Sequence, residues 1–308
     1  MTPAQLDAFV AVAQANSFTT AAIMLGISQS AVSHAIKSIE KELGVALFVR
    51  GKAEIVLTDV GSNILVKTHS VLGLFESIKQ TANESKNLQQ GVLKIGSFGP
   101  SFSAHLLPII LCEYQKHYPH IKVHIEEGED HQVKEWVADR KVDLGCIILP
   151  EQELDHIYLT TDNLSVVVST NHPLNKKSKL EIQDLCEFPF ILTEGSTGKM
   201  VMELFKRSGL RPNIRYTNIQ IMSMLSMVSS GPAVSITAEL SIPAGKQAKT
   251  GSYVSRKLYP VVNREIALAM QSRQHLSPAA AAFVKTAATL QRAGKLKPCN
   301  LEPKKSST

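Results

Sequence analysis

Residues 17–61 read SFTTAAIMLGISQSAVSHAIKSIEKELGVALFVRGKAEIVLTDVG, and this stretch decides the fold of the N-terminal part of the chain. Two serines in it are placed to begin helices, and two glycines are placed to end them. Ser17 predicts the cap of a short helix that ends at Gly26. Ser28 predicts the cap of a longer helix that ends at Gly44. With the amphipathic segment that precedes them, these signals predict three successive helices.

The third predicted helix has two chemically different faces. Val32, Ile36 and Ile39 recur at helical spacing and form an apolar stripe that a core would bury. The opposite arc is polar and consists of Gln29, Ser30, Ser33, His34, Lys37 and Lys41. Glutamine pairs with the edge of adenine, serine serves either strand, and lysine meets guanine or phosphate. This face suits the major groove of DNA, although the solvated face of an ordinary helix has the same pattern.

A short hairpin is predicted directly after this helix. Residues 46–49 read as a strand, Arg50-Gly51-Lys52 as a basic turn, and residues 55–57 as the returning strand. Two cations at the tip of such a hairpin suit the DNA backbone or the minor groove. Residues 1–58 are therefore predicted to form a winged helix-turn-helix domain. The residues predicted to contact DNA are Ser28, Gln29, Ser30, Ser33, His34, Lys37, Arg50 and Lys52.

The composition is that of a soluble globular protein with about two domains. The 308 residues are 44% hydrophobic and 19% charged, with a mean hydropathy of +0.01. No stretch is apolar enough for a membrane helix and no signal peptide is recognisable, so a cytoplasmic location is expected. The net charge of +6 favours an anionic partner, yet residues 1–60 contain four Lys/Arg against five Asp/Glu. The local pattern, and not the bulk charge, therefore carries the DNA-binding prediction.

A long linker helix is predicted after the winged domain, from a cap at Thr58 to about Ser85, with residues 59–87 as the linker. Its apolar residues alternate in steps of four and three, which is the period of a seam between two helices. The residues predicted to pair two copies of the chain are Ile64, Val71, Phe75 and Ile78. Packing against the chain's own domains is the alternative. Two linked domains would hold DNA more tightly than one.

Strands and helices alternate over residues 88–295, which indicates a parallel α/β sheet. The series of strands restarts part-way along, so two subdomains with a cleft between them are expected. Subdomain I is predicted over about 91–161 plus 265–290, and subdomain II over about 162–264. Residues 296–308 are predicted to be a flexible basic tail. The fold class is thus α+β multidomain, with a DNA-binding domain ahead of a two-subdomain α/β domain.

Two polar loops in this region are the predicted small-molecule site, because ligands of α/β sheets bind beyond the strand ends, near helix N-termini. Serine and threonine at such places also serve simply as helix caps. The residues predicted to contact a small molecule are Ser97, Phe98, Ser101, Phe102, Glu129, Cys146, Ser196 and Thr197. The acidic residues at 126–130 would oppose an anion and favour an amine or another donor, so the ligand class stays open.

The quoted stretch resembles the N-terminal signature of LysR-type transcriptional regulators. The matching residues are Ser17-Phe18, Ala21-Ala22, Leu25, Ser28 to Ser33, Ile36, Ile39-Glu40, Leu43-Gly44, Leu47-Phe48, Arg50, Leu57-Thr58 and Gly61. Further matches, such as Leu106-Leu107-Pro108 and His172-Pro173-Leu174, extend the resemblance over nearly the whole chain. Two positions depart from the family pattern. His34 stands where arginine is very common, and Thr237 lies where the family commonly continues to a proline.

The resemblance implies a ligand-controlled regulator of transcription. It implies an effector domain similar to periplasmic binding proteins, with a small-molecule effector in the cleft between the subdomains. It also implies a homodimer or homotetramer on inverted-repeat half-sites in double-stranded promoter DNA, with RNA polymerase as a further partner. Activation or repression, and dimer or tetramer, stay open.

An enzyme and a solute-binding receptor are the alternative functions. The sequence contains no nucleophile-elbow, zinc-protease or dinucleotide-binding motif, and residues 195–200 match only the end of a phosphate-binding loop. His124 alternates with apolar residues on the polar face of a predicted strand, so the nearby histidines do not predict a metal site. A solute receptor leaves the N-terminal helices unexplained. A non-enzymatic regulator without cofactor or metal is therefore predicted.

Overall fold

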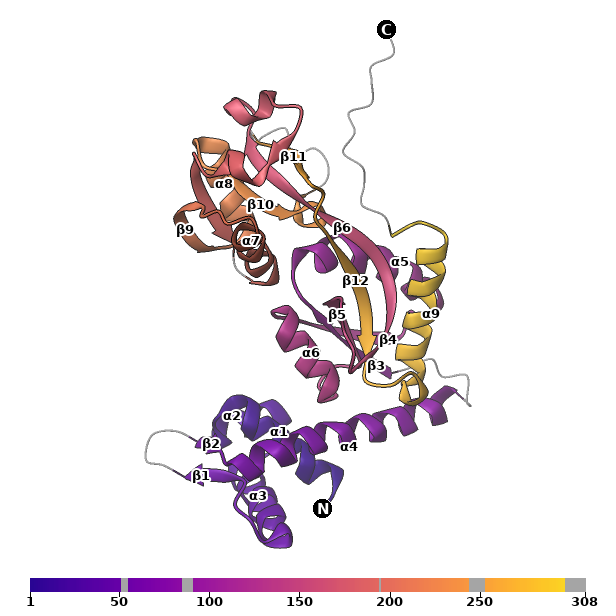
Figure 1. Cartoon of the computed structure of the whole chain (residues 1–308). Coiled ribbons are helices and arrows are strands. Elements are labelled where there is room, and N and C mark those ends of the chain that lie inside the picture. Colours follow the sequence, from indigo (N-terminus) through magenta and orange to yellow (C-terminus); the bar gives the residue numbers. More distant parts are fainter. Residues whose placement is uncertain (51–54, 85–90, 194, 244–252, 297–308) are drawn as a thin grey trace.

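The computed structural model describes residues 1–50, 55–84, 91–193, 195–243 and 253–296. An N-terminal helical domain and a long helix lie at one end of the molecule, and a two-lobed α/β domain extends away from them (Figure 1). Within the described ranges, no helix is both long enough and apolar enough to cross a lipid bilayer.

The N-terminal domain contains the three predicted helices and the two strands of the wing. They are α1 (Pro3–Ala15), α2 (Phe18–Leu25), α3 (Gln29–Leu43), β1 (Phe48–Arg50) and β2 (Ile55–Leu57). The predicted helix signals are confirmed: the Ser17 and Ser28 hydroxyls accept backbone N–H groups of α2 and α3. Gly26 and Gly44 end these helices with φ of +66° and +70°, in the left-handed region that favours glycine.

The core of this domain is built from the apolar faces of its helices and the wing. Val32, Ile36 and Ile39 of α3 are fully buried, as their spacing predicts. They pack in one cluster with Phe9 of α1 and Phe48 of β1, whose rings meet edge to face at 5.5 Å between centroids. The polar arc of α3 is consequently turned outward.

The linker helix α4 (Asp59–Glu84) begins where the sequence predicts, because the Thr58 hydroxyl accepts the N–H of Gly61 at 2.8 Å. It packs on the N-terminal core through Ile64, Leu65 and Leu72. Helix α9 (Pro278–Arg292), which belongs to the α/β domain, also packs against α4. The linker is thus fixed to the DNA-binding domain and also touches the α/β domain.

The α/β domain has two lobes joined by two long strands. Lobe I contains β3 (Gly91–Ser97), the π-helix η1 (Ser101–Leu106), α5 (Leu107–His117), β4 (Ile121–Glu127), α6 (Asp130–Ala138), β5 (Leu144–Ile148) and α9 (Pro278–Arg292). Lobe II contains β7 (Leu180–Glu181), β8 (Pro189–Thr193), α7 (Gly195–Arg207), β9 (Asn213–Ile219), α8 (Ile221–Ser230), β10 (Ser235–Ala238), the 3-10 turn η4 (Glu239–Ser241) and β11 (Tyr253–Tyr259).

The joining strands are β6 (Asp155–Ser169) and β12 (Asn263–Met270), which pair antiparallel with each other. The first half of β6 lies beside β12, and its second half pairs with β10 and β11 of lobe II. Figure 1 shows both strands running from one lobe into the other.

The sheet of the described residues is mixed, in the order β4-β3-β5-β12-β6-β11-β7, with β10 also on β6. The predicted parallel pairing is present in β3–β4 and β3–β5. The purely parallel prediction is wrong for β12, which pairs antiparallel with β5 and β6. The reason is that β12 comes from a late segment that returns from lobe II to lobe I, so its direction is set by the crossing and not by a βαβ unit.

Candidate functional site

The outer face of α3 is the first candidate site. Gln29, Ser30, His34 and Lys37 are exposed, and Ser33 is half-buried. The predicted polar arc therefore lies on the surface, at the end of the molecule opposite lobe II (Figure 1). The Ser28 hydroxyl is engaged in capping and lies 2.9 Å from the Ser30 hydroxyl.

The wing lies beside α3, with Phe48 to Arg50 of β1 paired to Ile55 to Leu57 of β2. The predicted contact residue Lys52 lies outside the described residues. Gln29, Ser30, His34 and Lys37 form one continuous exposed surface of a single helix, which is the arrangement that a groove-reading helix requires.

The second candidate site is a cavity of about 510 Å³ between the two lobes, called the cleft cavity below. Lobe I contributes Phe98 and Ser101, and lobe II contributes Ser196 and Thr197. Arg264 on the crossing strand β12 completes the wall between them. The cavity therefore touches both lobes and the strand that joins them.

Arg264 forms the floor of the cleft cavity, and its side chain is almost wholly buried. Its Nε and Nη2 donate to Asp162 Oδ2 on β6 at 3.1 and 2.8 Å. Nη1 donates to Thr197 Oγ1 of lobe II at 3.1 Å, and Nη2 donates to Ser101 Oγ of lobe I. One guanidinium thus binds a residue of each lobe while Asp162 neutralises its charge.

Two further contacts span the cavity. The Ser101 hydroxyl lies 2.6 Å from the hydroxyl of Ser241 in η4. At the rim, Lys199 Nζ of α7 lies 3.2 Å from Glu129 Oε2 of lobe I. Because Glu129 is 43% exposed and Lys199 is 72% exposed, water screens this ion pair. The buried Arg264 contacts are the stronger link between the lobes.

The predicted small-molecule residues divide into two groups. Phe98, Ser101, Glu129, Ser196 and Thr197 all line the cleft cavity. The other three, Ser97, Phe102 and Cys146, are fully buried and are not part of its lining. Phe102 and Cys146 belong to the hydrophobic core of lobe I.

Burial explains the chemistry of that second group. It raises the pKa of the Cys146 thiol well above its ordinary value, so the thiol stays protonated and unreactive at neutral pH. The Ser97 hydroxyl is buried without a hydrogen-bond partner among the described residues. Within the same part of the chain, no cluster of His, Cys, Asp and Glu is arranged to hold a metal ion.

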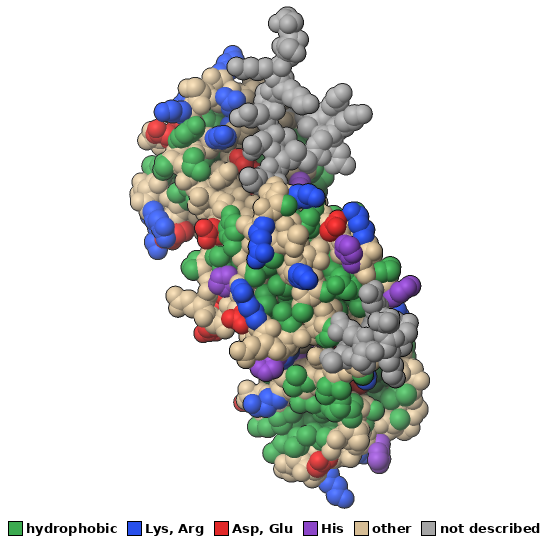
Figure 2. Space-filling model, turned by 90° about the vertical axis from the view of Figure 1, so that its right-hand side faces the viewer, with side chains coloured by type: hydrophobic (Ala, Val, Ile, Leu, Met, Phe, Trp, Pro, Cys, Tyr) green, Lys and Arg blue, Asp and Glu red, His purple; other side chains and the backbone are tan. Residues whose placement is uncertain are grey.

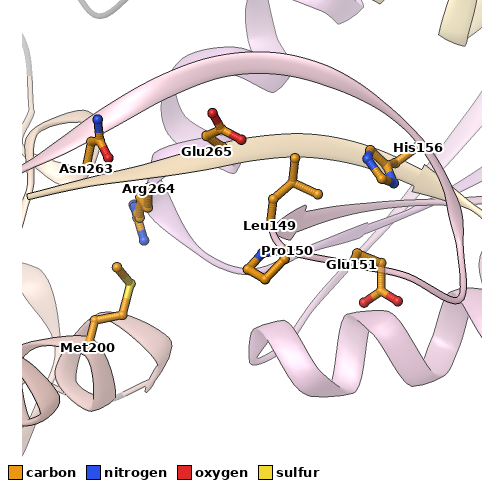
Figure 3. A pocket seen from close by; sticks show the side chains of 8 residues that line it. All are labelled: Leu149, Pro150, Glu151, His156, Met200, Asn263, Arg264 and Glu265. Carbon is orange, nitrogen blue, oxygen red and sulfur yellow. The ribbon is translucent and has the colours of Figure 1, made fainter.

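A second cavity of about 420 Å³ is also lined by Arg264. Figure 3 shows its lining: Arg264 points from β12 toward Met200 of α7, while Glu151 and His156 lie at the far end. Arg264 therefore borders both cavities.

The proposed pairing surface of α4 runs from Val71 toward the C-terminal end of the helix. Val71, Leu74 and Phe75 are at least 40% exposed and Ile78 is 65% exposed. Ile64 instead packs against the N-terminal core of its own chain. In Figure 2, hydrophobic side chains gather on the lower part of the molecule, over the N-terminal domain and α4.

Comparison with known proteins agrees with this architecture. Residues 3–62 match the model of the bacterial regulatory helix-turn-helix proteins of the lysR family, and residues 86–291 match the LysR substrate binding domain. The chain belongs to the LysR family of transcriptional regulators. Together the two matches cover the DNA-binding domain and both lobes, and the stretch between them, residues 63–85, holds most of the linker helix.

LysR relatives align with this chain over nearly their full length. The HTH-type transcriptional regulator YvbU of Bacillus subtilis is 34% identical over 291 residues, covering 94% of this chain and 99% of YvbU. GltC, a transcriptional dual regulator of the same organism, is 28% identical and covers 91% of this chain and 94% of its own. The similarity therefore extends over both the DNA-binding domain and the α/β domain of this family member.

Solved LysR structures share the fold. Full-length OxyR from Pseudomonas aeruginosa has a TM-score of 0.72 and 25% identity, covering 95% of this chain and 98% of that one. CbnR in complex with its target DNA has a TM-score of 0.63, 22% identity, and coverage of 94% and 99%. The second likeness concerns the fold alone.

Among the residues that sequence reasoning missed in this LysR cleft are Ser241 and Arg264 of the cavity lining, and Asp162 behind Arg264. Asp162 and Arg264 are charged residues next to apolar runs that become β6 and β12. A charged residue beside an apolar run indicates a polar side chain on a buried strand, and this was the only signal in the sequence for these two residues. Their pairing across 102 residues has no local signal.

Proposed function

We propose that this LysR-type regulator binds promoter DNA through α3 and the wing, and that a small molecule in the cleft cavity changes that binding. The cleft cavity carries the proposal, because its lining comes from both lobes and from the strand between them. A molecule that fills it has different contacts in open and closed arrangements of the lobes. Such a difference in affinity is what shifts a conformational equilibrium.

The route from the cleft to the DNA runs through lobe I. Its helix α9 contacts α4, and α4 packs on the N-terminal core that holds α3. A movement of lobe I relative to α4 would change the spacing of two DNA-binding domains in a dimer. Because inverted half-sites fix that spacing, promoter binding would respond.

Promoter DNA is the first test. The full chain should protect a site upstream of its own or a neighbouring gene in a footprint, and bind that duplex more tightly than a random duplex of equal length. Equal affinity for both duplexes at the same salt concentration would contradict specific recognition. Salt must be matched because phosphate contacts dominate non-specific binding.

The dimer is the second part of the proposal. Phe75→Asp places a charge on the exposed half of α4 and should reduce the sedimenting mass to that of one chain. Val66→Asp is the matched control, because Val66 is 37% exposed on the opposite face of the same helix. If Phe75→Asp sediments like the unchanged protein, α4 does not pair through this stripe.

A further inference from the structure

The chemistry of the cleft cavity identifies the class of its ligand. We propose that the ligand is a small zwitterion of the amino-acid type, with its carboxylate on Arg264 and its ammonium group facing Glu127 and Glu129. The proposal rests on the cleft cavity being the effector site. The cavity lining contains a buried cation, Arg264, and two more exposed carboxylates, Glu127 and Glu129, and each kind of group selects one half of the ligand.

The floor offers donors that a carboxylate would use better than the present acceptors. Two of the Arg264 hydrogen bonds go to the neutral hydroxyls of Ser101 and Thr197. A carboxylate brings an opposite charge and can accept two parallel hydrogen bonds from one guanidinium, which a single hydroxyl cannot do. A ligand carboxylate can therefore displace these hydroxyls while Asp162 keeps holding the guanidinium from behind.

The charge balance of the floor leaves room for one anionic group. Asp162 offsets the formal charge of Arg264, so the extra positive charge must come from elsewhere. Helices α7 and α8 begin at the cavity, since Gly195 and Ile221 both line it. Each helix N-terminus is equivalent to roughly +0.5 charge. The two together match a single carboxylate, and no side chain caps the start of α8.

An unsatisfied hydroxyl gives independent support. Thr237 lines the cavity and is only 2% exposed, yet its hydroxyl has no hydrogen-bond partner among the described residues. Unlike Ser97 Oγ, the Thr237 hydroxyl is not sealed from the cavity, so it is free to donate a hydrogen bond to a ligand there. Thr237 lies on β10 of lobe II, where it would donate to the same ligand that Arg264 holds.

The rim has the opposite charge. Glu127 ends β4 and is exposed, and Glu129 is half-buried at the start of α6. Glu129 is shared with Lys199 and His131, at 3.2 and 3.4 Å, whereas neither of these groups contacts Glu127. A second carboxylate on the ligand would meet repulsion here, and an ammonium group would be attracted. The rim therefore excludes dicarboxylates and selects zwitterions.

Matched probes test the ligand class on the full chain. The proteinogenic L-amino acids are screened by thermal shift, and each one that binds is compared with its decarboxylated amine and its deaminated acid. At least one amino acid should raise the Tm in a saturable way, its amine should have no effect, and its deaminated acid should bind more weakly. The proposal is overturned if no amino acid raises the Tm, or if the amine binds equally well.

Variants locate the binding mode. Arg264→Gln should abolish the rise in Tm that the amino acid causes. Thr237→Val is the second variant, for the case that loss of Arg264 unfolds the lobes, because valine has the same shape as threonine and lacks only the hydroxyl. Thr237→Val should weaken the binding of the amino acid about tenfold, as expected for a hydrogen bond to a charged group. Ser103→Ala is the matched control, because this neighbouring hydroxyl bonds to Gly99 O and does not line the cavity. Equal affinity of Thr237→Val and Ser103→Ala would overturn the binding mode.

The rim is tested by charge removal. Glu127→Gln should weaken the binding of the amino acid and strengthen the binding of its deaminated acid. Glu126→Gln should change neither affinity, because Glu126 pairs with Lys141 outside the cavity. Unchanged selectivity in Glu127→Gln would remove the ammonium half of the proposal.

Failure of the ligand class and failure of the proposed function are distinguishable. If an amine or another non-zwitterion changes promoter binding, the regulatory function stands and the zwitterion is wrong. If an amino acid binds through Thr237 but promoter binding does not respond, the ligand assignment stands and the regulation is wrong.

Discussion

The recognition face of α3 and the floor of the cleft cavity are built in opposite ways. The recognition face comes from one helix of 15 residues, whose caps and spacing are written in consecutive positions. The floor joins Ser101, Asp162, Thr197 and Arg264, and its longest contact spans 163 residues. The first site depends on a small local core, and the second on the correct pairing of both crossing strands. Damage to one should leave the other intact.

The largest expected effect is in the N-terminal domain. Phe9→Ala removes a fully buried ring that packs on Phe48, so the domain should lose about 3–5 kcal/mol of unfolding free energy. Promoter binding should disappear. The single tryptophan, Trp136, lies in lobe I, so urea unfolding followed by its fluorescence should not change, while circular dichroism gains an early transition. A shifted Trp136 transition would show that the two regions unfold together.

Asp162→Ala is the reciprocal test in the cleft. It leaves the buried Arg264 without its counter-charge, and removing one partner of a buried pair costs about 3–5 kcal/mol. The unfolding transition reported by Trp136 fluorescence should move to a lower urea concentration, and the unfolding transition of the N-terminal domain should stay unchanged. Asp155→Ala is the control, because this exposed carboxylate only accepts the N–H of Arg273. If the two variants lose the same unfolding free energy, the Asp162–Arg264 ion pair does not stabilise the fold.

Gln29→Ala tests the recognition face without affecting its core. Gln29 is exposed, so stability should stay within about 0.5 kcal/mol of the unchanged protein. Binding to the promoter site should weaken by about 1–3 kcal/mol if the side chain reads a base. A loss of the same size on random DNA would assign Gln29 to the backbone instead.

The smallest effect concerns pH and lobe II. Burial lowers the pKa of His172 below its ordinary 6.5, since the residue is only 3% exposed. As the pH falls below about 6.5, the unfolded chain binds a proton that the folded chain refuses, so stability decreases toward acid. The slope is at most about 1.4 kcal/mol per pH unit. His172→Gln should reduce this acid sensitivity in thermal unfolding between pH 7 and 5, and the exposed His117→Gln should not.

Sequence reasoning succeeded where the information is local. Ser17, Ser28 and Gly44 mark helix ends through their own side chains or their lack of one, and Val32 and Ile36 mark a core by spacing. It also found five residues that line the cleft cavity, because serine and threonine at strand ends recur near helix N-termini. It could not find Arg264, since burial of a charge depends on a partner distant in the sequence. The direction of β12 was missed for the same reason.

The uninterrupted course of β6 limits how this regulator can be divided. Its 15 residues extend for roughly 50 Å at the usual rise per residue, and each half completes the sheet of a different lobe. Neither lobe can therefore be excised as an independent module, since any cut between them removes a strand from one sheet. A shortened chain that ends inside β6, or a protease nick there, would cost both lobes their fold at once. The two lobes are therefore a single folding unit, and α4 connects that unit to the DNA-binding domain.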